Sequence, residues 1–321
     1  MFDLPKYGDG VCLARLAELL DVLRVDRAWL QNRSVVVTGS NGKGSTAAMC
    51  AAIGRASGLR TGLFTSPHFL RFNERIRIDG TEIGDEAFAR LKQRVEAGIA
   101  AVLATRNERF GAFEALFALA CLHFQQADCE FMVFEAGIGG RYDPVRLVGA
   151  LQTCVTSVDY EHVELLGTTL ELIASDKSDA CASGGTIIYG ENCRELRRHL
   201  TEYNRHREIT SLFVRDEIAV EAAQRLADRL DITVLLTRPG DVVPRRTNEF
   251  PVLKGTIRNA RGHLGQFELA IDDYALPSPS SRAKLMFGPS RNGATSSCDL
   301  ILDLSGGAPL FPAHELRPGY L

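Results

Sequence analysis

The sequence lacks long apolar runs, a secretion signal and an excess of basic residues. No stretch approaches the roughly 18 apolar residues expected of a membrane span, and the opening MFDLPKYGDG lacks the basic-then-apolar layout of a signal peptide. The formal net charge is -3, which gives the chain no general attraction for nucleic acid. We therefore expect a cytoplasmic protein with no membrane and no nucleic-acid partner.

Closely spaced cysteine pairs are also missing. The chain has 8 cysteines, but no two of them form a C-x-x-C pair, and several lie in apolar segments such as TCVTSV and ALACLHF. Buried free thiols are the interpretation that this placement favours. Disulfides or a zinc site are the alternatives.

What the chain does contain is enough apolar sequence for a substantial core. Its 321 residues are 45% hydrophobic and 24% charged, which suits one large or two ordinary domains and does not suit a disordered chain. A globular enzyme or binding protein is consistent with these values. We find no internal repeat.

Strand and helix signals alternate through most of the chain. Leucines at helical spacing predict an opening helix near 13–23, and ERIRIDGTEIGD predicts a hairpin about Asp79 and Gly80. Apolar strands are predicted at FMVFEA, TCVTSV, GTIIY and SLFV, with helices near 168–182, 192–204 and 218–230. This alternation predicts an α/β fold with a mostly parallel sheet and helices on both faces.

The stretch VVVTGSNGKGST predicts a strand, a glycine-rich loop and the start of a helix. Glycines let backbone N–H groups approach phosphates, and the lysine supplies a positive charge. A tight strand-to-helix connection with no ligand is the alternative. The spacing G-x-x-G-K-G-S-T favours binding of a nucleotide triphosphate. The residues of this lysine loop are Gly39, Ser40, Asn41, Gly42, Lys43, Gly44, Ser45 and Thr46.

Four motifs over about 10–190 resemble one known family. They are VVVTGSNGKGST, GLRTGLFTSPHFLRFNERIRIDG, FEAGIGGRYD and VDYEHVELLGTTLELIASDKSD. The sequence is similar to the Mur ligase superfamily, and within it to the folylpolyglutamate synthase/dihydrofolate synthase branch. The resemblance implies an amide ligase that uses ATP and Mg²⁺ to activate a carboxylate acceptor as an acyl phosphate, which the amine of an amino acid, glutamate in particular, then attacks.

The resemblance also implies roles for individual residues. Ser66, Glu135 and His162 match the family's magnesium-site positions, and Lys43 and His162 are expected to take part in catalysis. Lys177 matches a lysine that the family carbamylates into an anionic metal ligand, and we expect it to be catalytic as well. An ordinary exposed helix lysine is the alternative for Lys177, because the family's E-K-A-G reads D-K-S-D here, with Asp176 in place of glutamate.

Two positions resemble the family's substrate pocket. Phe113 lies where the family has an aromatic near the pterin, and Asp143 where it has an aspartate facing the same pocket. A core phenylalanine and a helix cap are the alternatives. The following residues, Pro144 to Arg146, depart from the family's Ala-Thr-Asn, which puts a pteroate-type acceptor in question.

The last part of the chain departs further. We expect a Mur ligase-like ATP-binding domain over 1–275 and a Pro/Ser/Gly-rich linker and short tail over 276–321, a remnant of the family's C-terminal domain. LILDLSGGAPLFP contains one plausible strand, with Leu304, Ser305 and Gly306 in the places of the family's G-A-H. The alternative function is therefore a nucleotide-binding module that has lost ligation and acts with a protein partner or through self-association.

Overall fold

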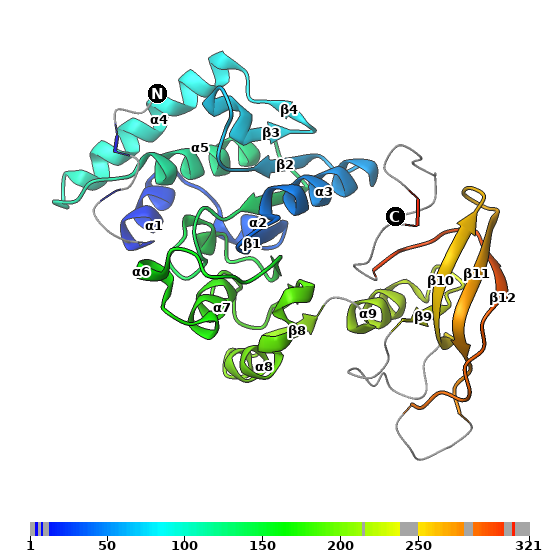
Figure 1. The fold of residues 1–321 in the computed structure, drawn as a ribbon. Helices are drawn as coiled ribbons and strands as arrows, with labels where there is room; N and C mark the ends of the chain where they lie inside the picture. Colours follow the sequence, from blue (N-terminus) through cyan, green and yellow to red (C-terminus); the bar gives the residue numbers. More distant parts are fainter. Residues whose placement is uncertain are drawn as a thin grey trace. The chain divides into compact units, whose positions relative to one another are not determined.

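The computed structural model divides the chain into two compact units, Met1–Ser211 and Leu212–Leu321. We call them unit 1 and unit 2 and consider each by itself (Figure 1). The residues that the structure describes are 4, 5, 8, 13–213, 216–237, 250–278, 285–304, 310 and 311.

Unit 1 is built around an eight-stranded sheet in the order β4-β3-β2-β5-β1-β6-β7-β8 (Figure 1). The pairs β2–β5, β5–β1, β1–β6 and β6–β7 are parallel, which confirms the predicted mostly parallel sheet. The predicted hairpin is β3–β4, joined to β2 antiparallel. The strands are β1 Ser34–Thr38, β2 Thr61–Phe64, β3 Ile76–Ile78, β4 Thr81–Glu82, β5 Phe131–Glu135, β6 Gln152–Val155, β7 Thr186–Tyr189 and β8 Thr210–Phe213.

The helices of unit 1 follow the predicted apolar spacings. The opening helix is α1, and the helix expected after the lysine loop is α3. Among the described helices of the chain, none is both long and apolar enough to cross a membrane. The α-helices are α1 Leu13–Val22, α2 Arg27–Gln31, α3 Lys43–Ala56, α4 Asp85–Leu103, α5 Ala112–Gln126, α6 Val163–Leu166, α7 Leu170–Ser178 and α8 Arg197–Arg205, and the 3₁₀ helices are η1 Phe72–Arg75, η2 Pro144–Val148 and η3 Glu191–Leu196.

The strands of unit 1 bury side chains on both faces. Phe64 and Phe134 pack into the large core that α1, α4 and α5 share, whereas their neighbours Leu63 and Val133 pack into a second cluster under α3. Successive strand residues point to opposite faces of a sheet. Helices therefore cover both faces, as predicted, and the central strands β1, β2 and β5 are mostly apolar because both of their faces are buried.

Unit 2 has a separate four-stranded sheet in the order β12-β11-β10-β9. The β10–β11 and β11–β12 pairs are antiparallel, and β9 pairs with β10 in parallel. One core cluster joins α9 to β9, and a second lies around Phe267 and Ile301. The elements are α9 Asp216–Leu226, β9 Val234–Leu236, β10 Val252–Arg261, β11 Phe267–Ala275 and β12 Ala294–Cys298.

The domain boundary differs from the one expected after residue 275. Compact packing divides the chain after Ser211, because β10 and β11 pair with each other in unit 2. The stretch interpreted as a linker contains β12, which pairs with β11. No strand of the structure lies over 300–304, where LILDLSGG was expected to begin one, and residues 305–307 of that stretch lie outside the described residues.

Candidate functional site

The predicted phosphate and metal residues follow neighbouring strands of the unit 1 sheet. The strands β2, β5, β1 and β6 are neighbours and run parallel, so their carboxyl ends lie side by side, which is where α/β sheets bind ligands. Ser66 follows β2 and Glu135 ends β5. The lysine loop follows β1, and His162 comes after β6. The topology thus gathers the candidates for the phosphate and metal sites.

The lysine loop needs its glycines for steric reasons. Gly39 has φ +141°, and a Cβ there would lie 2.0 Å from Thr156 Oγ1. Gly42, which caps α3, is left-handed with φ +82°. Only glycine adopts such backbone conformations without strain. The loop can therefore approach the segment after β6 closely.

Hydrogen bonds fasten the loop to that segment. Thr156 Oγ1 donates to the Asn41 carbonyl at 2.6 Å, and the Asn41 N–H donates to Ser157 Oγ at 2.8 Å. The Ser40 N–H donates to the Ser157 carbonyl at 2.9 Å, and the Asp159 N–H donates to Ser40 Oγ at 2.8 Å. The segment that follows β6 consequently sets the conformation of the loop.

The start of α3 has the features of an anion site. Its cap residue Gly42 offers no side chain to the first-turn N–H groups, and such N–H groups with the helix dipole favour a bound anion. Lys43 Nζ donates to the Gly39 carbonyl at 2.8 Å and to the Ser40 carbonyl at 3.2 Å. The ammonium therefore lies over the loop. There it can exchange its hydrogen bonds to these carbonyls for hydrogen bonds to a phosphate.

Glu135 is a buried carboxylate next to the loop. Its side chain is 3% exposed, Oε2 accepts a 2.9 Å hydrogen bond from the Ser66 N–H, and a Cβ on Gly44 would lie 3.4 Å from Oε1. Burial raises its pKa, although the Ser66 N–H, Lys43 and Arg75 oppose that rise. Burial thus disfavours the ionised form of the carboxylate, and a bound cation would stabilise that form.

Lys177 is completely buried on α7, so it is not the exposed helix lysine considered as the alternative. Its ammonium forms an ion pair with Glu161. Burial lowers the pKa of Lys177 and Glu161 opposes this, while Lys43 adds repulsion. Burial is the largest single effect on the Glu161 pKa and raises it, but the hydrogen bond and charge of Lys177, together with Ser40 and Lys43, lower that pKa on balance. The amine that carbamylation requires is thus engaged as an ammonium.

His162 occupies a separate position at the start of α6. It has φ +41° and caps the helix through its backbone, and its side chain is exposed. Among the residues that the structure describes, no three His, Cys, Asp or Glu side chains are grouped to hold a metal ion. Glu135 with Ser66 is therefore the part of the predicted metal set that the structure brings into contact.

The two predicted substrate residues lie together beside Gly137. A Cβ on Gly137 would lie 3.0 Å from the Phe113 ring and 3.2 Å from Asp143 Oδ2. Asp143 accepts hydrogen bonds from the N–H groups of Gly137, Ile138 and Val145 at 2.8, 3.0 and 3.0 Å. It caps η2, the structural alternative considered for it. Its role toward a substrate stays a prediction, as does that of Phe113, whose ring centroid lies 5.6 Å from that of Phe64 with the two rings tilted.

Asp176, the residue that departs from the family's glutamate, connects two elements of unit 1. It is 3% exposed, and its Oδ1 accepts a 2.9 Å hydrogen bond from the Gly140 N–H. This bond ties α7 to the loop that contains FEAGIGGRYD. Asp176 therefore positions the helix that carries Lys177.

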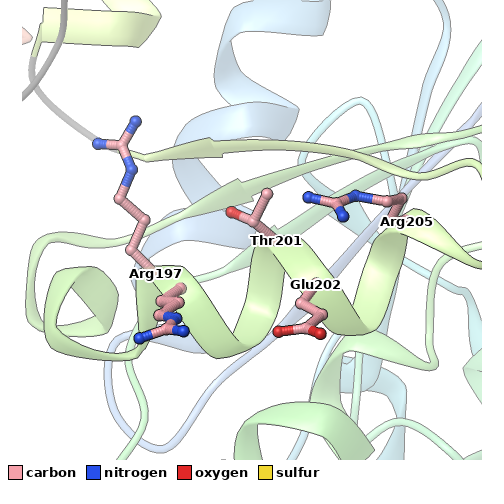
Figure 2. Close-up of a pocket in the computed structure, with 5 residues that line it drawn as sticks. Arg197, Thr201, Glu202 and Arg205 are labelled. Carbon is pink, nitrogen blue, oxygen red and sulfur yellow. The ribbon is translucent and has the colours of Figure 1, made fainter.

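A pocket of about 410 Å³ lies elsewhere, on α8, and Figure 2 shows side chains that project into it. None of the predicted site residues lines it. Its character is basic, because three of its five lining side chains are arginines. The lining residues are Arg197, Arg198, Thr201, Glu202 and Arg205.

Sequence patterns missed several residues that shape the site. Thr156 and Ser157 hold the loop, and Glu161 pairs with Lys177. One signal for Glu161 is its position next to His162 in the motif VDYEHVELLGTTLELIASDKSD, after an apolar strand.

Comparison with known proteins finds relatives in the family that the sequence motifs resemble. No family model matches the chain. The chain is 34% identical over 184 residues to a dihydrofolate synthase/folylpolyglutamate synthase of Bacillus subtilis (strain 168), covering 57% of this chain and 42% of that protein. It is 37% identical over 188 residues to the folylpolyglutamate synthase of Lacticaseibacillus casei, covering 58% of this chain and 43% of that protein.

A solved complex of folylpolyglutamate synthase with AMPPCP and folate has a similar fold. The TM-score is 0.62 at 25% identity, with 84% of this chain and 57% of that chain covered. Fold and site together define an α/β protein with a mostly parallel sheet and a glycine-rich phosphate loop at the start of a helix. More particularly, the chain is similar to the folylpolyglutamate synthases and dihydrofolate synthases, which confirms the resemblance of its motifs. It spans less than half the length of the two curated relatives.

Proposed function

We propose that this chain is an ATP- and Mg²⁺-dependent amide ligase of the folylpolyglutamate synthase type. It phosphorylates a carboxylate to an acyl phosphate, and the amine of an amino acid displaces the phosphate to form the amide. The observation that carries the proposal is the lysine loop at the start of α3 with the buried Glu135 beside it. The names of the similar proteins support it.

ATP would bind with its phosphates on the lysine loop. The uncapped first-turn N–H groups of α3 receive phosphate oxygens, and Lys43 exchanges its two loop carbonyls for them. Both interactions are charge-assisted. Phosphoryl transfer onto a carboxylate brings anions together, so fixed positive charge contributes more here than a nucleophilic side chain does.

Glu135 and Ser66 fit a magnesium site. Mg²⁺ is usually held by one or two carboxylates, waters and substrate phosphates, so a single buried carboxylate beside the phosphate loop is a sufficient protein contribution. Bound Mg²⁺ would neutralise part of the negative charge of the phosphates. His162 and a carbamylated Lys177 are further proposed ligands and catalytic groups. Lys177 can take this role only if its amine first separates from Glu161.

The acceptor and the amino acid are proposed from the relatives. Dihydrofolate synthase and folylpolyglutamate synthase are the names of the similar proteins, and these names favour a folate-type carboxylate and glutamate. Phe113 and Asp143 are the proposed contacts with the acceptor. We also propose a cytoplasmic location. A protein partner or self-association that completes the site remains part of the alternative proposal.

Phosphate release by purified protein tests the proposed ligase. The chain is incubated with ATP, Mg²⁺, glutamate and a folate-type acceptor, and each cosubstrate is omitted in turn. Phosphate release and amide product that require both cosubstrates support the ligase. ATP binding without turnover would instead support the nucleotide-binding module. Lys43→Ala is the control for release by contaminating phosphatases.

A further inference from the structure

The pocket on the outer face of α8, which we call the basic pocket, has the size and charge of an anion site. Its volume of about 410 Å³ falls within the range of about 300–1,000 Å³ that small-molecule sites occupy. Three arginines and one glutamate among its five lining residues give it a formal charge of +2. Figure 2 shows Arg197, Thr201 and Arg205 projecting from the same side of α8, as residues four apart in a helix do.

The inner face of α8 is fixed to the rest of unit 1. Leu200 and Asn204 are completely buried, and Asn204 Nδ2 donates to the Tyr189 hydroxyl at 2.7 Å. The Tyr203 hydroxyl donates to Asp179 Oδ1 at 3.0 Å. The helix cannot turn about its axis without breaking these contacts. It therefore presents the side chains of its outer face from a rigid element, as a binding site requires.

Two arginines of the basic pocket are available to a ligand. Both Arg198 and Arg205 are exposed. Within the described part of the chain, their side chains form no ion pair or hydrogen bond, although Glu202 lies about one helical turn from each. Arg207, just beyond the end of α8, instead donates to Asp179 Oδ1 at 2.7 Å. The guanidinium groups of Arg198 and Arg205 can therefore bind an anion from solution without first breaking an ion pair.

We propose that the basic pocket is a binding site for a multivalent phosphate anion of about the size of pyrophosphate. Guanidinium groups bind phosphate through two parallel N–H···O bonds and keep their charge at any physiological pH. Thr201 adds a hydroxyl donor to the lining. Arg198 and Arg205 lie about two helical turns apart, so an anion with two linked phosphate groups can bind both. This site is separate from the lysine loop and does not depend on the proposed function.

Glu202 provides a test with the opposite sign. It is the one acidic side chain among the lining residues, so its carboxylate repels an anion that the arginines attract. Removal of its charge should strengthen binding, whereas removal of an arginine should weaken it. Both effects are largest at low ionic strength, because salt screens exposed charges. A helix face that is merely solvated would show neither effect.

Calorimetric titration of the full chain with pyrophosphate at low ionic strength tests the proposal. The background is Lys43→Ala without Mg²⁺, which reduces binding at the lysine loop. We expect saturable binding that is weakened at least about threefold by Arg198→Gln and by Arg205→Gln, and about tenfold by both together. Glu202→Gln should bind more tightly. Arg27→Gln is the matched control and should bind unchanged, because it removes an exposed arginine of α2 outside the pocket.

Several outcomes would overturn the proposal. They are the absence of saturable binding, binding that the double arginine variant leaves unchanged, and binding that Arg27→Gln weakens equally. Citrate that binds as tightly as pyrophosphate would refute the assignment to phosphate. Thermal melting checks that each variant is folded, and the variant with lysine at both 198 and 205 should recover only part of the affinity, since lysine keeps the charge and loses the bidentate bonds. The titration needs neither ATP nor turnover, so it is decided separately from the proposed ligase.

Discussion

The buried ammonium of Lys177 on α7 forms an ion pair with Glu161, which lies in the segment after β6. One carboxylate thus joins α7 to the segment that holds the lysine loop. Lys177 is 0% exposed, so water cannot take the place of Glu161.

Glu161→Gln should therefore destabilise the fold. The substitution keeps the shape of the side chain and leaves the Lys177 ammonium without a neutralising charge, which we expect to lower the free energy of unfolding by about 1–3 kcal/mol. Urea denaturation at neutral pH measures it. The double variant Glu161→Gln, Lys177→Met is the control and should recover most of the loss, since it removes both charges. A single variant as stable as the wild type would show that the pair contributes little.

Lys43→Ala should weaken ATP binding and leave the fold intact. Lys43 donates only to carbonyls of its own loop, so its loss removes few structural contacts. Its charge-assisted bonds to phosphate should be worth about 1–3 kcal/mol of binding free energy. Calorimetric titration and thermal melting measure the two quantities. Unchanged affinity would remove the basis of the phosphate site.

Glu135→Gln should separate metal binding from stability. The amide keeps an oxygen for the Ser66 N–H, and burial already disfavours the charged carboxylate, so the melting temperature should change little. Metal-dependent nucleotide binding or turnover should collapse because the anionic ligand is gone. Titration with ATP at several Mg²⁺ concentrations measures this. A variant that melts early and still binds would make Glu135 a structural residue.

Gly39→Ala should disturb the loop more than an ordinary glycine substitution does. The new Cβ would lie 2.0 Å from Thr156 Oγ1 at a residue with φ +141°. Strain at such positions costs about 1–3 kcal/mol. Gly84→Ala is the matched control, because a Cβ there meets nothing within 4 Å. Thermal melting of both variants should show the larger loss for Gly39→Ala, and equal losses would contradict the steric argument.

Sequence pattern predicted the sheet of unit 1 well because its central strands β1, β2 and β5 are buried on both faces. Apolar runs such as FMVFEA are strong signals when neither side of a sheet meets water. Unit 2 gave weaker signals. Most side chains of β12 are at least partly exposed, so this strand is held by pairing with β11 and its composition resembles a linker. That explains the displaced boundary at residue 275.

The same limit applies within the site. The lysine loop is local in sequence, and its order of strand, loop and helix was predicted correctly. Glu161 and Lys177 are 16 residues apart and meet only because α7 packs back against the segment after β6. Such a pair has no local spacing from which a sequence pattern could predict it.

Asp143 should make stability depend on pH in a way that Asp143→Asn removes. Burial raises its pKa from 3.8 to about 6, although the N–H groups of Val145, Ile138 and Gly137 oppose the rise. Between these values the folded state holds more protons than the unfolded state, so stability from this group is greatest below pH 3.8 and is lost as pH rises through about 6. A shift of about two pKa units corresponds to about 3 kcal/mol.

Urea unfolding of the wild type and of Asp143→Asn from about pH 4 to 7 tests this prediction. The quantity to compare is the free energy of unfolding of the wild type minus that of the variant, because the contributions of the other titrating groups cancel in this difference. We expect that difference to fall with rising pH; a constant difference would mean that buried Asp143 ionises as it does in the unfolded chain.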